Sequence, residues 1–161
     1  MAARPFSLQP GDDGPLYEGP HGPLVLSANQ DEDATRMMSP QGEARLAWGM
    51  LSRDRAALQR GVSLHIGRRD LSLRRVGRSL EVQDAQGRAL AIVRRRRLGR
   101  VVVERPDGDE VAWFKPTSLS GEVDEAASAD EVVLLLLMMG SNAGATLERG
   151  IPLLSPFGSW P

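Results

Sequence analysis

The chain has no cysteine among its 161 residues, and this absence excludes disulfide bonds, thiolate metal sites and cysteine nucleophiles together. It is compatible with a reducing compartment, and we expect a cytoplasmic location. Histidine is nearly as scarce, and neither His21 nor His65 has partners at metal-ligand spacing. The acidic run 31–33 lacks the spacing of a calcium loop. We therefore predict no metal site, no cofactor and no enzymatic activity.

Aromatic residues make up only 4% of the chain, so aliphatic side chains must supply most of the core. Lysine occurs once, at Lys115, and arginine carries the remaining positive charge. That charge is uneven: residues 61–105 hold 12 arginines and 4 acids, whereas residues 106–161 hold 2 basic residues and 9 acids. The basic segment either neutralises acidic flanks within the fold or faces a partner.

No apolar run is long enough to cross a membrane, and the N-terminus lacks the apolar core of a signal peptide. The longest run, Val132–Met139, has 8 residues and lies in an uncharged window of 16, whereas a bilayer crossing needs about 20. A stretch that is apolar on every side must be enclosed by something. We expect a soluble protein in which the rest of the chain encloses this stretch.

The residues before this stretch predict where its helix begins. Ser128 precedes Glu131 by three residues, the spacing of a helix capping box. We therefore expect a helix that begins near Ala129. It either ends at Gly140 as a C-cap or continues to Leu147.

Three stretches share one design, in which a turn ends in glycine and is followed by an aliphatic residue, an alanine and a large apolar residue. The glycines are Gly42, Gly87 and Gly108, and the apolar triplets are 46–48, 90–92 and 111–113. Glycine supplies the positive φ that tight hairpin turns require. We therefore predict three β-hairpin corners.

Alternation of apolar and polar residues around these corners predicts about nine short strands, mostly in an antiparallel meander. Apart from the strand after Gly42, they cover residues 23–28, 35–38, 62–66, 71–74, 80–82, 89–93, 100–104 and 110–114. Residues 51–61 are expected to form a short helical turn or an exposed loop. Lys115 and Pro116 end the strand pattern.

The chain is short enough to be one domain, with less ordered ends. We expect a flexible Pro/Gly-rich arm with a short strand at 16–18, a β-barrel domain, an acidic linker and a C-terminal tail. These parts cover residues 1–22, 23–150, 117–127 and 151–161 respectively, with the helix near 129–147.

Many short antiparallel strands followed by one helix admit two arrangements, both mainly β. In a pleckstrin-homology-like barrel the helix caps one open end, and only one helix face is apolar. In a threaded barrel the strands enclose the helix on all sides. Leu134–Leu137 covers every direction of the helix, which favours an antiparallel barrel of about nine to twelve strands around it.

The glycine-turn corners near residues 42–48, 87–92 and 108–113, with the late apolar helix at 132–139, resemble the tubby-like superfamily. The LURP-one-related and phospholipid-scramblase-like proteins are the most similar in pattern. The resemblance covers residues 23–148 and implies a closed barrel of twelve strands around a central hydrophobic helix. The chain differs from scramblases because it has no calcium-binding segment and no cysteines for palmitoylation.

The run Arg94, Arg95, Arg96 and Arg97, followed by Arg100, is the strongest candidate binding feature. In an extended strand these side chains point alternately to opposite faces. Guanidinium groups suit phosphate, and other arginines between residues 68 and 78 can widen the patch. Alternatively, the run is surface charge neutralised by the acidic segment 122–131. Nucleic acid is disfavoured because no aromatic residues are interleaved with the arginines.

We therefore predict a non-enzymatic binding or scaffold module, whose partner is an anionic lipid headgroup or another protein. The first alternative is an anionic phospholipid- or phosphate-binding protein that uses residues 94–100. The second is a hydrolase, which would need His65 beside a carboxylate and a hydroxyl group. The ligand and the oligomeric state stay open.

Overall fold

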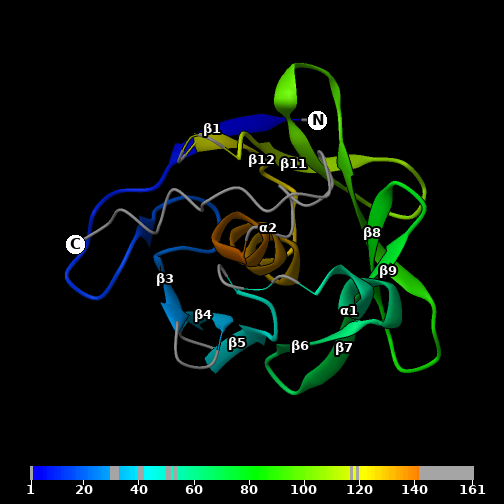
Figure 1. The fold of residues 1–161 in the computed structure, drawn as a ribbon. Coiled ribbons are helices and arrows are strands. Elements are labelled where there is room, and N and C mark those ends of the chain that lie inside the picture. Colours follow the sequence, from blue (N-terminus) through cyan, green and yellow to red (C-terminus); the bar gives the residue numbers. More distant parts are fainter. Residues whose placement is uncertain are drawn as a thin grey trace.

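The computed structural model describes residues 2–29, 33–39, 42–49, 52, 54–116, 118 and 120–141. Its strands form a ring around one long helix, α2, which Figure 1 views nearly end-on. The strands are β1 (Ala3–Ser7), β2 (Leu16–Tyr17), β3 (Leu24–Asn29), β4 (Ala34–Ser39), β5 (Gly42–Leu46), β6 (Val62–Ile66), β7 (Arg69–Val76), β8 (Ser79–Gln83), β9 (Ala89–Arg95), β10 (Val101–Glu104), β11 (Glu110–Phe114) and β12 (Ser120–Asp124). The helices are α1 (Arg55–Arg60) and α2 (Ala129–Ser141), with a 3-10 turn at Arg97–Gly99.

All twelve strands belong to one antiparallel sheet. From β2 to β12 each strand pairs with the next along the chain, and β1 pairs with β12. A single bridge between Gln9 and Leu16 then joins the β1 side to β2. The sheet is thus a nearly closed barrel, as the sequence predicted. Its twelve strands are the upper limit of the expected nine to twelve.

Helix α2 is enclosed by the barrel. Every side chain from Val132 to Met139 is buried, and Leu135, Leu136 and Leu137 are 0% exposed. Inward residues of the strands meet it, such as Leu64 in β6. The threaded arrangement is therefore confirmed, and the alternative of a helix that caps one end is wrong, because such a helix would keep one face in solvent.

The predicted capping box begins α2. The Ser128 N–H donates to Glu131 Oε1 (2.9 Å), and the Glu131 N–H donates to Ser128 Oγ (3.2 Å). The helix continues through Gly140, where a Cβ atom would lie 3.0 Å from Cγ2 of Thr35. Glycine thus lets β4 approach the helix rather than ending it. The expected continuation to Leu147 and the tail 151–161 lie outside the described residues.

Two of the predicted corners are tight turns of the same kind. Gly87 and Gly108 have positive φ, 81° and 96°, and their N–H groups donate to the carbonyls of Asp84 and Arg105. Gly42, with φ of 124°, begins β5 after the β4–β5 corner. Residues 55–60 form α1, in agreement with the expected helical turn.

The structure corrects two boundaries. The N-terminal residues contribute β1 and β2 to the barrel, so the expectation of a flexible arm over residues 1–22 was wrong. Likewise β12 lies in what we expected to be an acidic linker. Its inward positions include Gly121, where any Cβ would collide with the Trp113 carbonyl oxygen. Strands β1 and β12 bury few apolar side chains of their own, so hydrogen bonding to neighbouring strands holds them in place.

Among the described residues, no helix has the length and apolar character needed to cross a membrane.

A charge placed within α2 is expected to abolish cooperative folding. Leu136→Asp would bury an unpaired carboxylate at a cost of several kcal/mol, comparable with the roughly 5–15 kcal/mol that stabilises a typical domain. Thermal unfolding followed by circular dichroism is the measurement. Met38→Asp is the control, because Met38 is 51% exposed and should tolerate the charge. A Leu136→Asp protein that melts like the wild type would contradict the enclosed helix.

The seam between β1 and β2 is sensitive to alkaline pH through Tyr17. This side chain is 1% exposed, its ring packs edge-on against Phe6 at 5.5 Å, and its hydroxyl donates to the Pro20 carbonyl (3.0 Å). Burial raises the pKa of Tyr17 from 10.0 to about 12. Its neutral form is therefore favoured by folding, so this stability is intact below pH 10 and is lost as the pH rises from 10 to about 12.

We expect Tyr17→Phe to lower stability near neutral pH by about 1 kcal/mol, through the lost hydrogen bond. Above pH 10 the variant should lose less stability than the wild type. Tyr17 is the only tyrosine and Lys115 the only lysine, so tyrosinate absorbance reports one residue in a range where few other groups titrate. A wild-type tyrosinate titration centred at 10 would contradict the buried phenol.

Candidate functional site

The two ends of the barrel carry different connections. Successive hairpins of an antiparallel meander turn at alternate ends. The β6–β7, β8–β9 and β10–β11 connections lie where α2 begins, which we call the amino mouth. The β7–β8, β9–β10 and β11–β12 connections lie at the opposite end, the carboxyl mouth.

Two members of the arginine run are paired with a buried glutamate on the outer face of the sheet. Glu104 in β10 is 2% exposed. Its carboxylate accepts a hydrogen bond from Arg96 Nη2 (2.5 Å), and its other oxygen lies 3.3 Å from Arg94 Nε. This hydrogen bond and the charge of Glu104 raise the pKa of Arg96. Arg94 and Arg96 therefore share one face, as alternation predicted, and Glu104 offsets part of their charge.

The acidic segment does not contact the arginine run through the interactions described for it. Glu122 accepts a hydrogen bond from Trp113 Nε1 (3.1 Å), and Asp130 and Glu131 pair with arginines at the amino mouth. Neutralisation thus occurs, but the residue that supplies it to Arg94 and Arg96 is Glu104.

Arg100 lies over an aromatic ring beside a groove at the carboxyl mouth. Its guanidinium carbon is 4.1 Å from the centroid of Trp113, a cation–π contact. Its buried Nε has no hydrogen-bond partner within the described part of the chain. The groove has a volume of about 540 Å³ and also includes Arg97 and Leu98.

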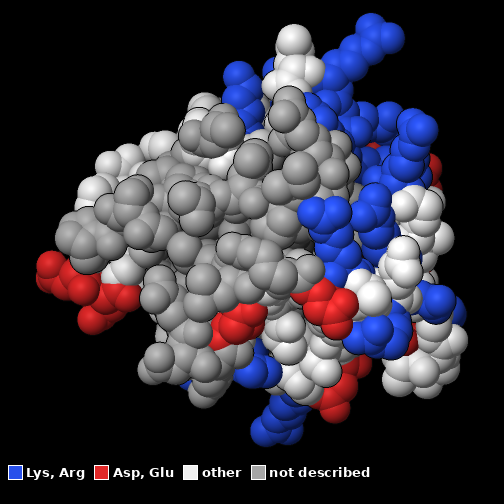
Figure 2. Space-filling view, viewed as in Figure 1, with Lys and Arg blue, Asp and Glu red and all other residues white. Residues whose placement is uncertain are grey.

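The β9–β10 connection presents an apolar tip between cationic side chains. Leu98 is 84% exposed with φ of 64°, and Arg95 and Arg97 are exposed. The neighbouring β7–β8 tip repeats this arrangement, since Val76 is 44% exposed between Arg75 and Arg78. Figure 2 shows basic side chains gathered over the part of the surface that carries β8 and β9 in Figure 1.

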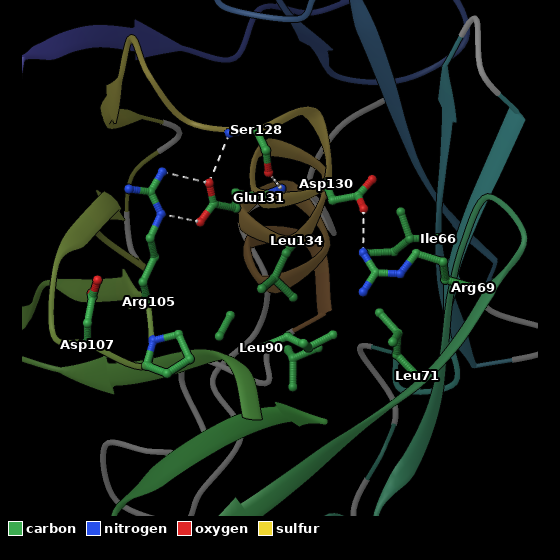
Figure 3. A pocket seen from close by; sticks show the side chains of 13 residues that line it. Ile66, Arg69, Leu71, Leu90, Arg105, Asp107, Ser128, Asp130, Glu131 and Leu134 are labelled. Atoms are coloured by element: carbon green, nitrogen blue, oxygen red, sulfur yellow. Dashed lines mark hydrogen bonds and ion pairs between the residues drawn. The ribbon is translucent and has the colours of Figure 1, made fainter. Parts of the chain in front are cut away.

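A separate hollow of about 500 Å³ opens at the amino mouth, between the first turn of α2 and the facing strands (Figure 3). Its floor is aliphatic, and its rim is charged. The floor comprises Ile66, Leu71, Val82, Leu90, Ala91 and Leu134. The charged lining residues are Arg69, Arg105, Asp107, Asp130 and Glu131.

Two ion pairs hold the rim of this hollow. Arg105 donates two hydrogen bonds to Glu131, both 3.1 Å, and Arg69 donates one to Asp130 (2.8 Å). Burial alone would raise the pKa of Glu131, but hydrogen bonds from Arg105 and the Ser128 N–H outweigh it and lower that pKa. Glu131 therefore serves the capping box and the rim at once.

His65 has one described side-chain contact. His65 points away from the buried Leu64 and Ile66, as predicted, and its Nδ1 lies 2.6 Å from Asp70 Oδ1. The side chain of His65 is 45% exposed and that of Asp70 is 84% exposed. This pair provides a histidine and a carboxylate on the outer surface. In the described part of the chain, no group of three histidines or carboxylates could hold a metal ion.

Several residues of these sites were not identified from the sequence. The partner of Arg94 and Arg96 had one signal in the sequence: Glu104 is an acidic residue directly after the apolar run Val101–Val103. The stack of Arg100 on Trp113 depends on the register that places Trp113 opposite Val102, which local patterning does not specify. The hollow joins residues from four distant segments, so no local motif marks it.

Comparisons with protein families, with characterised proteins and with solved structures give no match to this chain.

Glu131→Gln tests the rim at the amino mouth. The lowered pKa of Glu131 means that its contribution to stability is present above its ordinary pKa, 4.5, and is lost as the pH falls below that value. Glutamine keeps the size of the side chain but loses the charge. We expect the melting temperature at pH 7 to fall by about 2–4 °C, with a smaller further loss on acidification than in the wild type.

Glu43→Gln is the matched control, because Glu43 in the Arg36–Glu43 pair is 43% exposed, against 16% for Glu131, and its pair should matter less. If both variants melt alike at pH 7 and pH 4, the rim pair contributes nothing beyond an ordinary surface contact.

Proposed function

We propose that this protein is a non-enzymatic binding module whose carboxyl mouth docks on anionic phospholipid surfaces. One observation carries the proposal. The β9–β10 tip places an 84% exposed leucine, Leu98, between Arg97 and the stacked Arg100. We further propose a relationship to the tubby-like proteins, supported by twelve strands around a buried helix.

The ion pairs of Arg94 and Arg96 with Glu104 compensate part of the positive charge near this mouth. The guanidinium of Arg100 lies over the ring of Trp113, and its buried Nε has no described protein acceptor. Such a group can donate paired hydrogen bonds to phosphate oxygens. Arginine near an anionic membrane surface contributes about 1 kcal/mol per residue.

The apolar tips favour a membrane over free phosphate. Leu98 and Val76 belong to hairpins that are two strands apart, about 10 Å at the usual spacing of neighbouring strands. An exposed leucine has nothing to gain from a soluble phosphate, but burying it among acyl chains contributes about 1.5–3 kcal/mol. Cationic side chains around an apolar tip are typical of proteins that lie in a membrane interface.

Sedimentation with vesicles of neutral or partly anionic phospholipid tests this proposal. We expect binding that requires anionic lipid and weakens with salt. The double variant Arg97→Gln/Arg100→Gln should weaken binding about thirtyfold, at about 1 kcal/mol per charge. Leu98→Ser should weaken it about tenfold and leave the salt dependence unchanged.

Matched controls change the same properties at the amino mouth. Arg68→Gln/Arg88→Gln removes two exposed charges from the β6–β7 and β8–β9 connections, and Met38→Ser removes an apolar side chain that is 51% exposed. Both controls should bind like the wild type. The proposal fails if no binding occurs at low salt, or if the control variants lose as much affinity as those at the carboxyl mouth.

A further inference from the structure

The hollow at the amino mouth has a floor suited to an aliphatic chain. Leu71 and Leu90 are half-buried at its edge, and Leu134 from the first turns of α2 closes it from behind (Figure 3). At about 500 Å³ it lies within the range of sites that bind small molecules. We propose that it binds a small ligand with an aliphatic body and a single cationic group, of the alkylammonium class.

The net charge of the rim determines whether a cationic or an anionic ligand is favoured. The two arginines of the lining, Arg69 and Arg105, are each paired with a carboxylate of the helix. Asp107 is the remaining acid, and its described contact is one hydrogen bond that Oδ1 accepts from the Asp109 N–H (3.0 Å). The lining thus carries two positive and three negative charges, a net charge of −1.

The acid-rich side of the rim is the one around Arg105. The hydrogen bonds and charge of Glu131 raise the pKa of Arg105, and the charges of Asp107 and Asp109 raise it further. One guanidinium is thus paired with Glu131 and also feels the charges of two further carboxylates. An ammonium group beside Asp107 would balance that excess, at the side of the rim where Figure 3 shows Asp107 next to Arg105.

An anionic ligand of the same shape would be disfavoured, because both arginines of the lining are already paired with carboxylates. Arg105 is occupied by its two hydrogen bonds to Glu131 and a longer one to the Ala126 carbonyl (3.5 Å). To reach Arg69, a carboxylate would have to displace Asp130 and then lie beside it. Each step opposes binding, so charge separates two ligands with equal chains.

The site is held in place before any ligand arrives. The capping box and the bidentate Arg105–Glu131 pair fix one wall, and paired strands fix the floor. A preformed site avoids the cost of ordering side chains on binding. Affinity should therefore follow the length of the aliphatic chain until the hollow is full.

Hexylammonium, hexanol and hexanoate, which each have six carbons and carry a charge of +1, 0 and −1 respectively, test the proposal by titration calorimetry and methyl chemical shifts in NMR. We expect saturable binding of hexylammonium that perturbs the methyl groups of Leu71 and Leu90, weaker binding of hexanol and the weakest of hexanoate. Butylammonium, two methylenes shorter, should bind about fifteenfold more weakly than hexylammonium.

Two variants separate the charge from the chain. Asp107→Asn should weaken hexylammonium about two- to fivefold, as expected for an exposed ion pair, and leave hexanol unchanged. Leu90→Ala should weaken all three ligands. Asp12→Asn removes the same charge from the β1–β2 connection, at the other end of the barrel, and should change nothing.

Three results would each overturn the proposal. They are hexanoate binding as tightly as hexylammonium, an Asp107→Asn variant that binds hexylammonium like the wild type, and an absence of saturable binding or of shifts at Leu71 and Leu90. Thermal melts of the Leu90→Ala protein show whether it is folded, and Asp107→Asn provides a second, exposed position at which the proposal can fail.

Discussion

The enclosure of one apolar helix is the constraint on which the rest of the structure depends. Four consecutive leucines, Leu134–Leu137, leave α2 without a face that water can accept. A single sheet packed on one side would bury only part of it. Twelve short strands in a meander surround it instead, and the last of them is closed by β1 from the start of the chain. The N-terminal strand β1 therefore helps to bury the C-terminal helix α2.

A filled barrel also determines where binding can occur. In the part of the chain that the structure describes, α2 and the side chains that meet it occupy the interior, which in barrels without a helix can hold a ligand. The two candidate sites described here lie at the edges of the filled interior. One is the hollow before the first turn of α2, and the other is the outer groove beside the Arg100–Trp113 stack.

The elements that could be predicted from the sequence are those whose cause is local. The start of α2 follows from Ser128 and Glu131, and β6 and β11 follow from alternation at 62–66 and 110–114. The elements that were missed depend on distant partners. In β12 a glycine, Gly121, takes an inward position because another strand's backbone lies there, so the apolar pattern is absent. The partners of the arginine run likewise depend on register, which places Glu104 beside Arg94 and Arg96.

Strand direction explains why the described ion pairs between the acidic and basic segments lie at the amino mouth. Arg105 and the arginines of the β9–β10 tip are separated by the four residues of β10, about 14 Å of extended chain. That strand carries Arg105 to the amino mouth, where Glu131 at the start of α2 pairs with it. Arg97 and Arg100 stay at the carboxyl mouth, away from the first turn of the helix. A nearly neutral chain thus has paired charges at the amino mouth and a basic cluster at the β9–β10 tip, because this hairpin turns at the end of the barrel opposite the acids that begin α2.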